Sequence, residues 1–175
     1  MKIKKALALV ALPALGFALT SCGSKVENYG EDIVDIYNEA AEEMASCETP
    51  SDIDDAVMAI EKLAEEARKL ADEIEANSNK LRDEVYMELT IGELKEIEYN
   101  YRKNLSIANA NCEDGLYHVK EHVKGELKAL KKACSKLGEA LEKAEKNLEK
   151  AKSDERWKQL KNYSTFHRTN HYENF

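Results

Sequence analysis

Residues 127–151 read LKALKKACSKLGEALEKAEKNLEKA, and the apolar positions in this stretch decide the fold. They recur at alternating steps of three and four residues, which is the spacing of one helix face in a coiled-coil-like seam. The members of this seam are Leu127, Leu130, Cys134, Leu137, Leu141, Ala144, Leu148 and Ala151. The pattern predicts a long helix, over about residues 116–160, that packs against another helix.

A second seam runs through residues 52–90 and predicts another long helix. Its main positions recur every seven residues: Ile53, Ile60, Ala67, Ile74 and Leu81. Near Thr90 the phase of the pattern slips, and Thr90 with Glu93 has the spacing of a capping box that opens a helix over 93–110. A kink at this point would leave one continuous helix, whereas a turn would give two.

A shorter helix is predicted over 31–46, and the chain has no proline beyond Pro50. Together with abundant Ala, Leu, Glu and Lys, this composition predicts an all-α protein. Residues 109–115, NANCEDG, have the composition of a loop and predict a hairpin tip. We therefore expect an elongated antiparallel helical hairpin or coiled-coil rod, or a three-helix bundle. A compact four-helix bundle is the alternative.

The first twenty-two residues have the pattern of an export signal. Lys2, Lys4 and Lys5 precede an apolar run over 6–19, which is short for a membrane span that needs about 20 residues. The run ends in Leu19-Thr20-Ser21-Cys22, which resembles the lipobox of bacterial lipoproteins. The resemblance covers only the signal and Cys22. It implies cleavage before Cys22 and acylation of that cysteine, with palmitate or a similar fatty acid.

These features divide the chain into a signal peptide over 1–21, a lipidated tether over 22–30, one helical domain over 31–162 and a polar, aromatic tail over 163–175. Gly23 and Ser24 follow Cys22, with no acidic residue beside it. By analogy with Gram-negative lipoproteins, this favours the outer membrane if the host is Gram-negative. The expected location is the bacterial cell envelope, with the protein bound to the membrane through its lipid.

The formal net charge is −8, and removal of the three signal lysines makes it more negative. Such a charge argues against nucleic acid as a partner, because binding phosphate requires a basic surface. Acidic residues dominate 23–101, whereas basic residues outnumber them in 117–175. This asymmetry predicts helices that lie against each other with complementary charges.

Cysteine and histidine are the residues best suited to special chemistry. With Cys22 acylated, Cys47, Cys112 and Cys134 remain, and a rod would hold them too far apart for a disulfide. The histidines form two i, i+4 pairs: His118 with His122, and His167 with His171. Such a pair is a weak candidate for a metal site. The first pair fits H-x-x-E-H, but no third ligand accompanies it in the pattern. We expect no disulfide, cofactor, metal site or enzymatic activity.

Aromatic residues mark two candidate partner-binding surfaces. One is the expected hairpin tip, with Tyr99, Tyr101 and Tyr117. The other is the tail, with Tyr163, Phe166, Tyr172 and Phe175. Tyrosine and phenylalanine are enriched at protein interfaces.

The sequence thus predicts a lipid-anchored helical envelope protein that serves as a non-enzymatic interaction or structural module. Its expected partner is another envelope protein or a second copy of itself. The alternative is a periplasmic protein that binds a small ligand or metal through one histidine pair.

Overall fold

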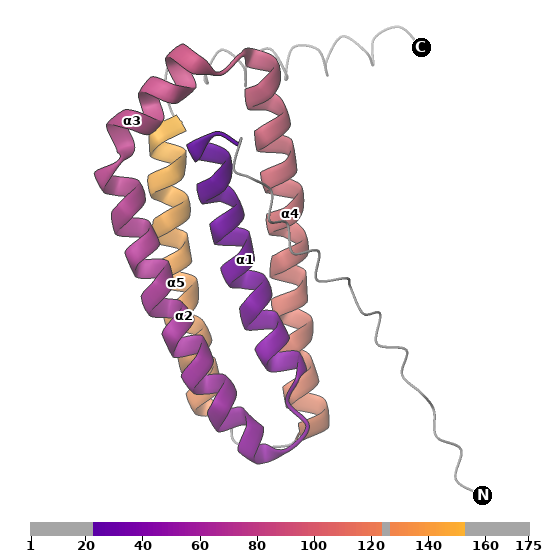
Figure 1. The fold of residues 1–175 in the computed structure, drawn as a ribbon. Helices are drawn as coiled ribbons and strands as arrows, with labels where there is room; N and C mark the ends of the chain where they lie inside the picture. Colours follow the sequence, from indigo (N-terminus) through magenta and orange to yellow (C-terminus); the bar gives the residue numbers. More distant parts are fainter. Residues whose placement is uncertain (1–22, 124–126, 153–175) are drawn as a thin grey trace, which may run out of the picture.

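The structure is a computed structural model that describes residues 23–123 and 127–152, and every regular element in these ranges is helical (Figure 1). The all-α prediction is therefore confirmed. The long helices are α1 (Lys25–Ala45), α2 (Pro50–Ala76), α4 (Ile91–His118) and α5 (Lys128–Lys152). The short ones are α3 (Ser78–Asp83) and the π-helical turns η1 (Glu84–Glu88) and η2 (Val119–Val123).

The four long helices form a bundle of two packed pairs. α2 lies along α5, and α1 lies along α4; α1 then joins the pairs by contacting α2 and α5 (Figure 1). Successive long helices run in opposite directions. This is the four-helix arrangement named as the alternative; the option of one continuous helix through 52–90 and 93–110, on which a rod would depend, is wrong.

A turn at Leu89 and Thr90 breaks that expected helix. Leu89 has an extended backbone, with φ −92° and ψ 136°. Thr90 and Glu93 form the predicted capping box: the Glu93 amide donates to Thr90 Oγ1 at 3.3 Å, and the Thr90 amide donates to Glu93 Oε2 at 2.8 Å. The box satisfies backbone groups at the start of α4, so the chain can reverse here.

The predicted loop over 109–115 is also wrong, because these residues lie inside α4. Gly115 is buried, and a Cβ there would stand 3.1 Å from the Ala41 carbonyl oxygen and from Met44 Cβ. The glycine thus allows α4 to approach α1 closely. It does not end the helix.

The predicted tether over 22–30 is shorter in the structure, since α1 begins at Lys25. Ser24 is its N-cap and accepts a hydrogen bond from the Glu27 amide at 3.1 Å. Val26 is 1% exposed and belongs to the core. Only Gly23 and Ser24 separate Cys22 from the bundle.

The two predicted seams pack against each other as α2 and α5. All five main positions of the α2–α3 seam are buried, and so are six of the α5 positions, with Leu127 and Cys134 half-buried. Lys136 reaches Glu61 at 2.6 Å and Lys143 reaches Asp72 at 2.7 Å across the seam. The expected charge complementarity is present between these helices. The predicted extension of the last helix over 153–160 lies outside the described residues.

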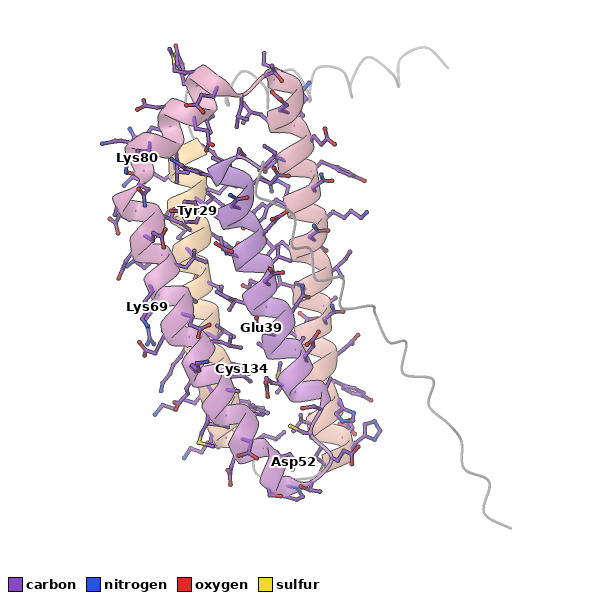
Figure 2. All side chains as sticks on the ribbon, in the orientation of Figure 1. Tyr29, Glu39, Asp52, Lys69, Lys80 and Cys134 are labelled. Carbon is purple, nitrogen blue, oxygen red and sulfur yellow. The ribbon has the colours of Figure 1, made fainter. Side chains whose placement is uncertain are left out.

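The exposure of the side chains is that expected for a helical bundle. Tyr29 and Cys134 lie among the helices, whereas Lys69 and Lys80 are exposed on α2 and α3 (Figure 2). Tyr29 Oη donates to Glu73 Oε1 at 2.9 Å and accepts from Asn77 Nδ2 at 3.3 Å, which ties α1 to the end of α2. Burial and the neighbouring Glu73 raise the pKa of Tyr29 to about 12, so the phenol stays protonated and keeps donating.

Candidate functional site

A group of half-buried polar side chains, with the buried Lys152 among them, lies where α1, α4 and α5 meet. We call it the interior polar cluster, and its members are Tyr37, Glu98, Tyr101, Glu145, Glu149 and Lys152. Polar groups removed from water destabilise the folded state unless they are paired. The pairing of these side chains therefore favours one register of the helices.

Tyr37 and Glu145 join α1 to α5 within this cluster. Tyr37 Oη donates to Glu145 Oε1 at 3.2 Å. Burial raises the pKa of Glu145, and the nearby Glu142 and Glu149 raise it further, while the hydrogen bond from Tyr37 opposes them. Burial and the Glu145 charge also raise the pKa of Tyr37. The phenol therefore acts as a hydrogen-bond donor and not as a base.

Tyr101 projects inward from α4 and packs against α1. A Cβ on Gly30 would stand 3.0 Å from Tyr101 Cδ2, so the glycine provides the space for this ring. The Tyr101 hydroxyl is buried and has no hydrogen-bond partner among the described residues. Burial, followed by the charge of Glu145, raises the pKa of Tyr101. A neutral, unpaired hydroxyl inside the bundle costs stability.

Lys152 supplies the positive charge of the cluster. Its side chain is 2% exposed, and its Nζ lies 3.1 Å from Glu98 Oε2, 3.2 Å from Glu149 Oε1 and 4.8 Å from the centre of the Tyr101 ring. Arg102 joins the same carboxylates, forming an ion pair with Glu98 and lying 3.9 Å from Glu149. These contacts fix the end of α5 against α4, because a buried charge is tolerated only when it is paired.

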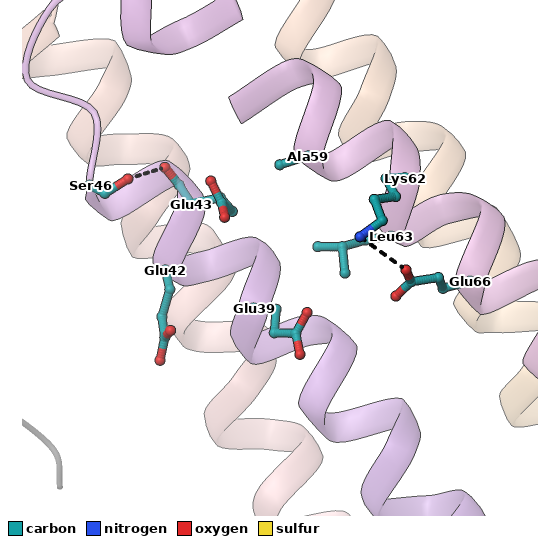
Figure 3. Close-up of a pocket in the computed structure, with 8 residues that line it drawn as sticks. All are labelled: Glu39, Glu42, Glu43, Ser46, Ala59, Lys62, Leu63 and Glu66. Atoms are coloured by element: carbon teal, nitrogen blue, oxygen red, sulfur yellow. Dashed lines mark hydrogen bonds and ion pairs between the residues drawn. The ribbon is translucent and has the colours of Figure 1, made fainter. Parts of the chain in front are cut away.

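An acidic groove lies on the opposite side of α1, between α1 and α2 (Figure 3). It has a volume of about 450 Å³ and is open to solvent. Its lining residues are Glu39, Glu42, Glu43 and Ser46 from α1, and Ala59, Lys62, Leu63 and Glu66 from α2. Lys62 lies 3.6 Å from Glu66, so the α1 wall retains a surplus of negative charge. Solvated glutamates on helix faces account for this groove without a ligand.

The first histidine pair lies at the junction of α4 and η2. The rings of His118 and His122 have centroids 5.2 Å apart, and His118 Nε2 lies 3.0 Å from the Cys47 carbonyl oxygen. Because a carbonyl oxygen can only accept, Nε2 carries the hydrogen and donates this bond, and His118 thereby ties α4 to the α1–α2 loop. Within residues 23–123 and 127–152, no three His, Cys, Asp or Glu side chains are grouped so as to hold a metal ion. His167 and His171 lie outside the described residues.

The three described cysteines are free thiols that pack in the interior of the bundle. Cys112 Sγ donates to the Tyr37 carbonyl oxygen at 3.0 Å, and Cys134 Sγ lies 3.8 Å from Met44 Sδ. Burial raises the pKa of Cys112 to about 11 and also raises the pKa of Cys47 and of Cys134. These thiols are therefore protonated and poorly nucleophilic at neutral pH.

The bundle changes where these thiols lie relative to one another. In a rod Cys47 and Cys112 would lie at opposite ends of the molecule, and this placement does not hold. In the bundle α1 and α4 lie side by side, and His118, on the same helix as Cys112, bonds to Cys47.

The tyrosines expected at a hairpin tip are distributed along α4. Tyr99 is 68% exposed and Tyr117 is 60% exposed, while Tyr101 belongs to the interior polar cluster. Tyr99 and Tyr117 share one helix face, about five turns and 27 Å apart. The tail residues Tyr163, Phe166, Tyr172 and Phe175 lie outside the described residues, as does Cys22.

Sequence reasoning missed the interior polar cluster, although part of the signal is visible. Glu145 and Glu149 flank the apolar seam position Leu148 on α5, where a purely apolar interface would exclude charge. Tyr101 falls in phase with the buried Leu94 and Ala108. The turn at Leu89 and Thr90 determines which helix these residues face. The spacing of residues in the sequence therefore could not predict that these side chains come together.

Comparison with family models, with curated proteins and with solved structures finds no match to this chain. None of the helices within the described ranges has both the length and the apolar character needed to cross a bilayer.

Proposed function

We propose that this protein is a lipid-anchored helical module of the bacterial envelope that acts by binding another protein, without catalysing a reaction. The observation that carries the proposal is the Leu19-Thr20-Ser21-Cys22 sequence, which resembles a lipobox and stands two residues before the N-cap Ser24. A cysteine acylated at this position would tether the bundle directly to a membrane.

The energetics of acylation fit a stable anchor. Each buried CH₂ of a fatty acid contributes about 0.8 kcal/mol, so several chains on Cys22 hold a protein on a bilayer without a transmembrane helix. Gly23 and Ser24 favour the outer membrane in a Gram-negative host.

The outer face of α4 is the surface proposed to bind the partner. Tyr99, Ile107 and Tyr117 are 68%, 51% and 60% exposed along this one helix. Tyrosine combines a large apolar surface with a hydrogen-bonding group, which suits it to protein interfaces. A second envelope protein or another copy of the chain would bury this face.

Mass spectrometry of the protein extracted from membranes tests the anchor. We expect a chain that begins at Cys22 and carries the additional mass of fatty acids. Cys22→Ser is expected to abolish both the cleavage and the added mass, whereas Cys134→Ser serves as the matched control and keeps both. An unmodified chain, or a Cys22→Ser protein that is processed normally, would refute the anchor.

Cross-linking in intact envelopes tests the partner-binding face. We expect a specific cross-linked complex that is lost in the double variant Tyr99→Ser with Tyr117→Ser. Replacement of the exposed Met58 on α2 by Ser is the control and should preserve the complex. Equal loss of the cross-linked complex in both variants would show that the α4 face is not the interface.

A further inference from the structure

We propose that the end of the bundle formed by η1 and the start of α4 lies against the phospholipid surface to which the chain is anchored. This inference rests on the proposed acylation of Cys22. It adds an orientation, because it assigns one end of the bundle to the membrane and directs the far end of α4, which carries Tyr117, away from the anchor.

Three exposed apolar side chains stand close together in sequence at this end. Met87 is 76% exposed, Tyr86 is 51% exposed and Ile91 is 46% exposed. Tyr86 and Met87 belong to η1, and Ile91 is the first residue of α4 just after the turn. We call Tyr86, Met87 and Ile91 the end patch. Exposure of neighbouring apolar residues at one end is typical of a contact surface.

The start of α1 is fixed to the same end. The Glu84 carboxylate accepts hydrogen bonds from the Lys25 amide at 2.8 Å and from the Val26 amide at 3.2 Å. Glu84 is the first residue of η1, the turn that carries Tyr86 and Met87. A carboxylate on the first amides of a helix also interacts favourably with the helix dipole. These bonds hold the beginning of α1 beside the end patch.

Covalent geometry then limits where the anchor can be. Only Gly23 and Ser24 lie between Cys22 and Lys25. At no more than about 3.6 Å per residue, the Cα atom of Cys22 lies within about 11 Å of the Cα atom of Lys25. An acylated Cys22 therefore brings the membrane surface to this end of the bundle and not to the end with the α1–α2 loop.

The chemistry of the end patch suits a lipid surface. Tyrosine prefers the boundary between headgroups and acyl chains, where its ring is apolar and its hydroxyl stays hydrated. Methionine and isoleucine can enter the upper acyl region beside it. Acidic residues outnumber basic ones in the sequence around the patch, which favours a zwitterionic headgroup over a strongly anionic one. Over residues 80–96 the acids are Asp83, Glu84, Glu88, Glu93 and Glu96, and the bases are Lys80, Arg82 and Lys95.

A photo-cross-linking experiment with the full lipidated chain tests this orientation. The photoreactive residue p-benzoylphenylalanine replaces Met87 in one protein and Met58 in another. Met58 is the matched control, because it is the same residue type, is 63% exposed and lies near the opposite end of the bundle on α2. After irradiation in vesicles of phosphatidylethanolamine and phosphatidylglycerol, intact mass is measured for each protein.

We expect position 87 to gain the mass of a phospholipid and position 58 to gain none above background. Phospholipid adducts in equal amounts at both positions, or a position 87 that cross-links to protein, to the C-terminal segment or to nothing, would overturn the orientation. The same mass spectra report the fatty acids on Cys22. Absence of these fatty acids overturns the proposed anchor, whereas an acylated chain without a lipid adduct at position 87 overturns only the orientation.

Discussion

The two helix pairs of the bundle are held together by different means. The α2–α5 pair is an apolar seam of leucine, isoleucine and alanine with ion pairs along its edges. The α1–α4 pair also buries apolar residues, but it adds a close approach at two glycines, an inward tyrosine and a thiol: Gly30, Gly115, Tyr101 and Cys112. A heptad seam stabilises the fold mainly through the apolar surface area that it buries. Two helices that approach each other closely instead require small residues at the points of contact.

The largest expected effect comes from truncating the heptad seam. Leu141 is fully buried, so Leu141→Ala should lower the free energy of unfolding by about 2–5 kcal/mol. Urea denaturation followed by circular dichroism measures the change. Met58→Ala on the exposed side of α2 is the control and should change stability by less than about 0.5 kcal/mol. Similar losses in both variants would contradict the assignment of α2–α5 as the main stabilising seam.

Filling the close approach of α1 and α4 should have the next largest effect. In Gly115→Val the added carbons would meet the Ala41 carbonyl oxygen and Met44, and overpacking of this kind costs about 1–3 kcal/mol. The comparison is Gly138→Val on α5, where a Cβ meets nothing within 4 Å. That variant should be neutral within about 0.5 kcal/mol, because valine is a slightly better helix former than glycine. Equal stability of the two variants in the same urea assay would show that Gly115 has no packing role.

This contrast explains how much of the fold the sequence predicts. The helical class, the two seams and the Thr90–Glu93 capping box could be read directly, because period and cap chemistry are local signals. The prediction of a loop at Gly115 was wrong because glycine beside asparagine and aspartate occurs in loops and also in helices that pack closely. Gly30 and its neighbours were likewise misread as a tether, although Gly30 makes room for the Tyr101 ring.

The candidate site was less predictable than the fold. Cys22 is identified by a contiguous pattern, so its role could be proposed from the sequence alone. The interior polar cluster joins α1, α4 and α5, and it forms only once the chain turns at Leu89 and Thr90. The end patch depends on Glu84 holding the start of α1 to η1, a contact between residues far apart in the sequence.

Two tyrosine variants distinguish paired from unpaired hydroxyls in the interior polar cluster. Tyr37→Phe removes the hydrogen bond to Glu145 and should lower the free energy of unfolding by about 1–2 kcal/mol. Tyr101→Phe removes a buried hydroxyl that has no partner among the described residues, and should be neutral or raise stability by up to about 1 kcal/mol. Urea denaturation of both proteins gives the signs, and a clear loss in Tyr101→Phe would indicate that this hydroxyl is hydrogen-bonded in solution.

The smallest expected effect concerns the charge of Glu145. Its pKa is raised in the folded state by burial and by Glu142 and Glu149, so the folded protein binds this proton more tightly than the unfolded chain does. The contribution of Glu145 to stability therefore falls as the pH rises through its folded pKa. Glu145→Gln removes the repulsion between residue 145 and Glu142 and Glu149, each such pair costing about 0.2–0.5 kcal/mol, and should raise the free energy of unfolding at neutral pH by about 0.5–1 kcal/mol.

The pH dependence of this gain is its most specific feature. The difference between Glu145→Gln and the parent should shrink as the pH is lowered, because the parent carboxyl then becomes protonated and loses its unfavourable charge. Urea denaturation at several pH values measures it, and Glu139→Gln on the exposed side of α5 is the control that should show no such gain. A Glu145→Gln protein less stable than the parent at neutral pH would mean that the bond from Tyr37 to the charged carboxylate outweighs the cost of its burial. In that case the Tyr37–Glu145 hydrogen bond would add to the stability that the apolar seam of α2 and α5 supplies by buried area.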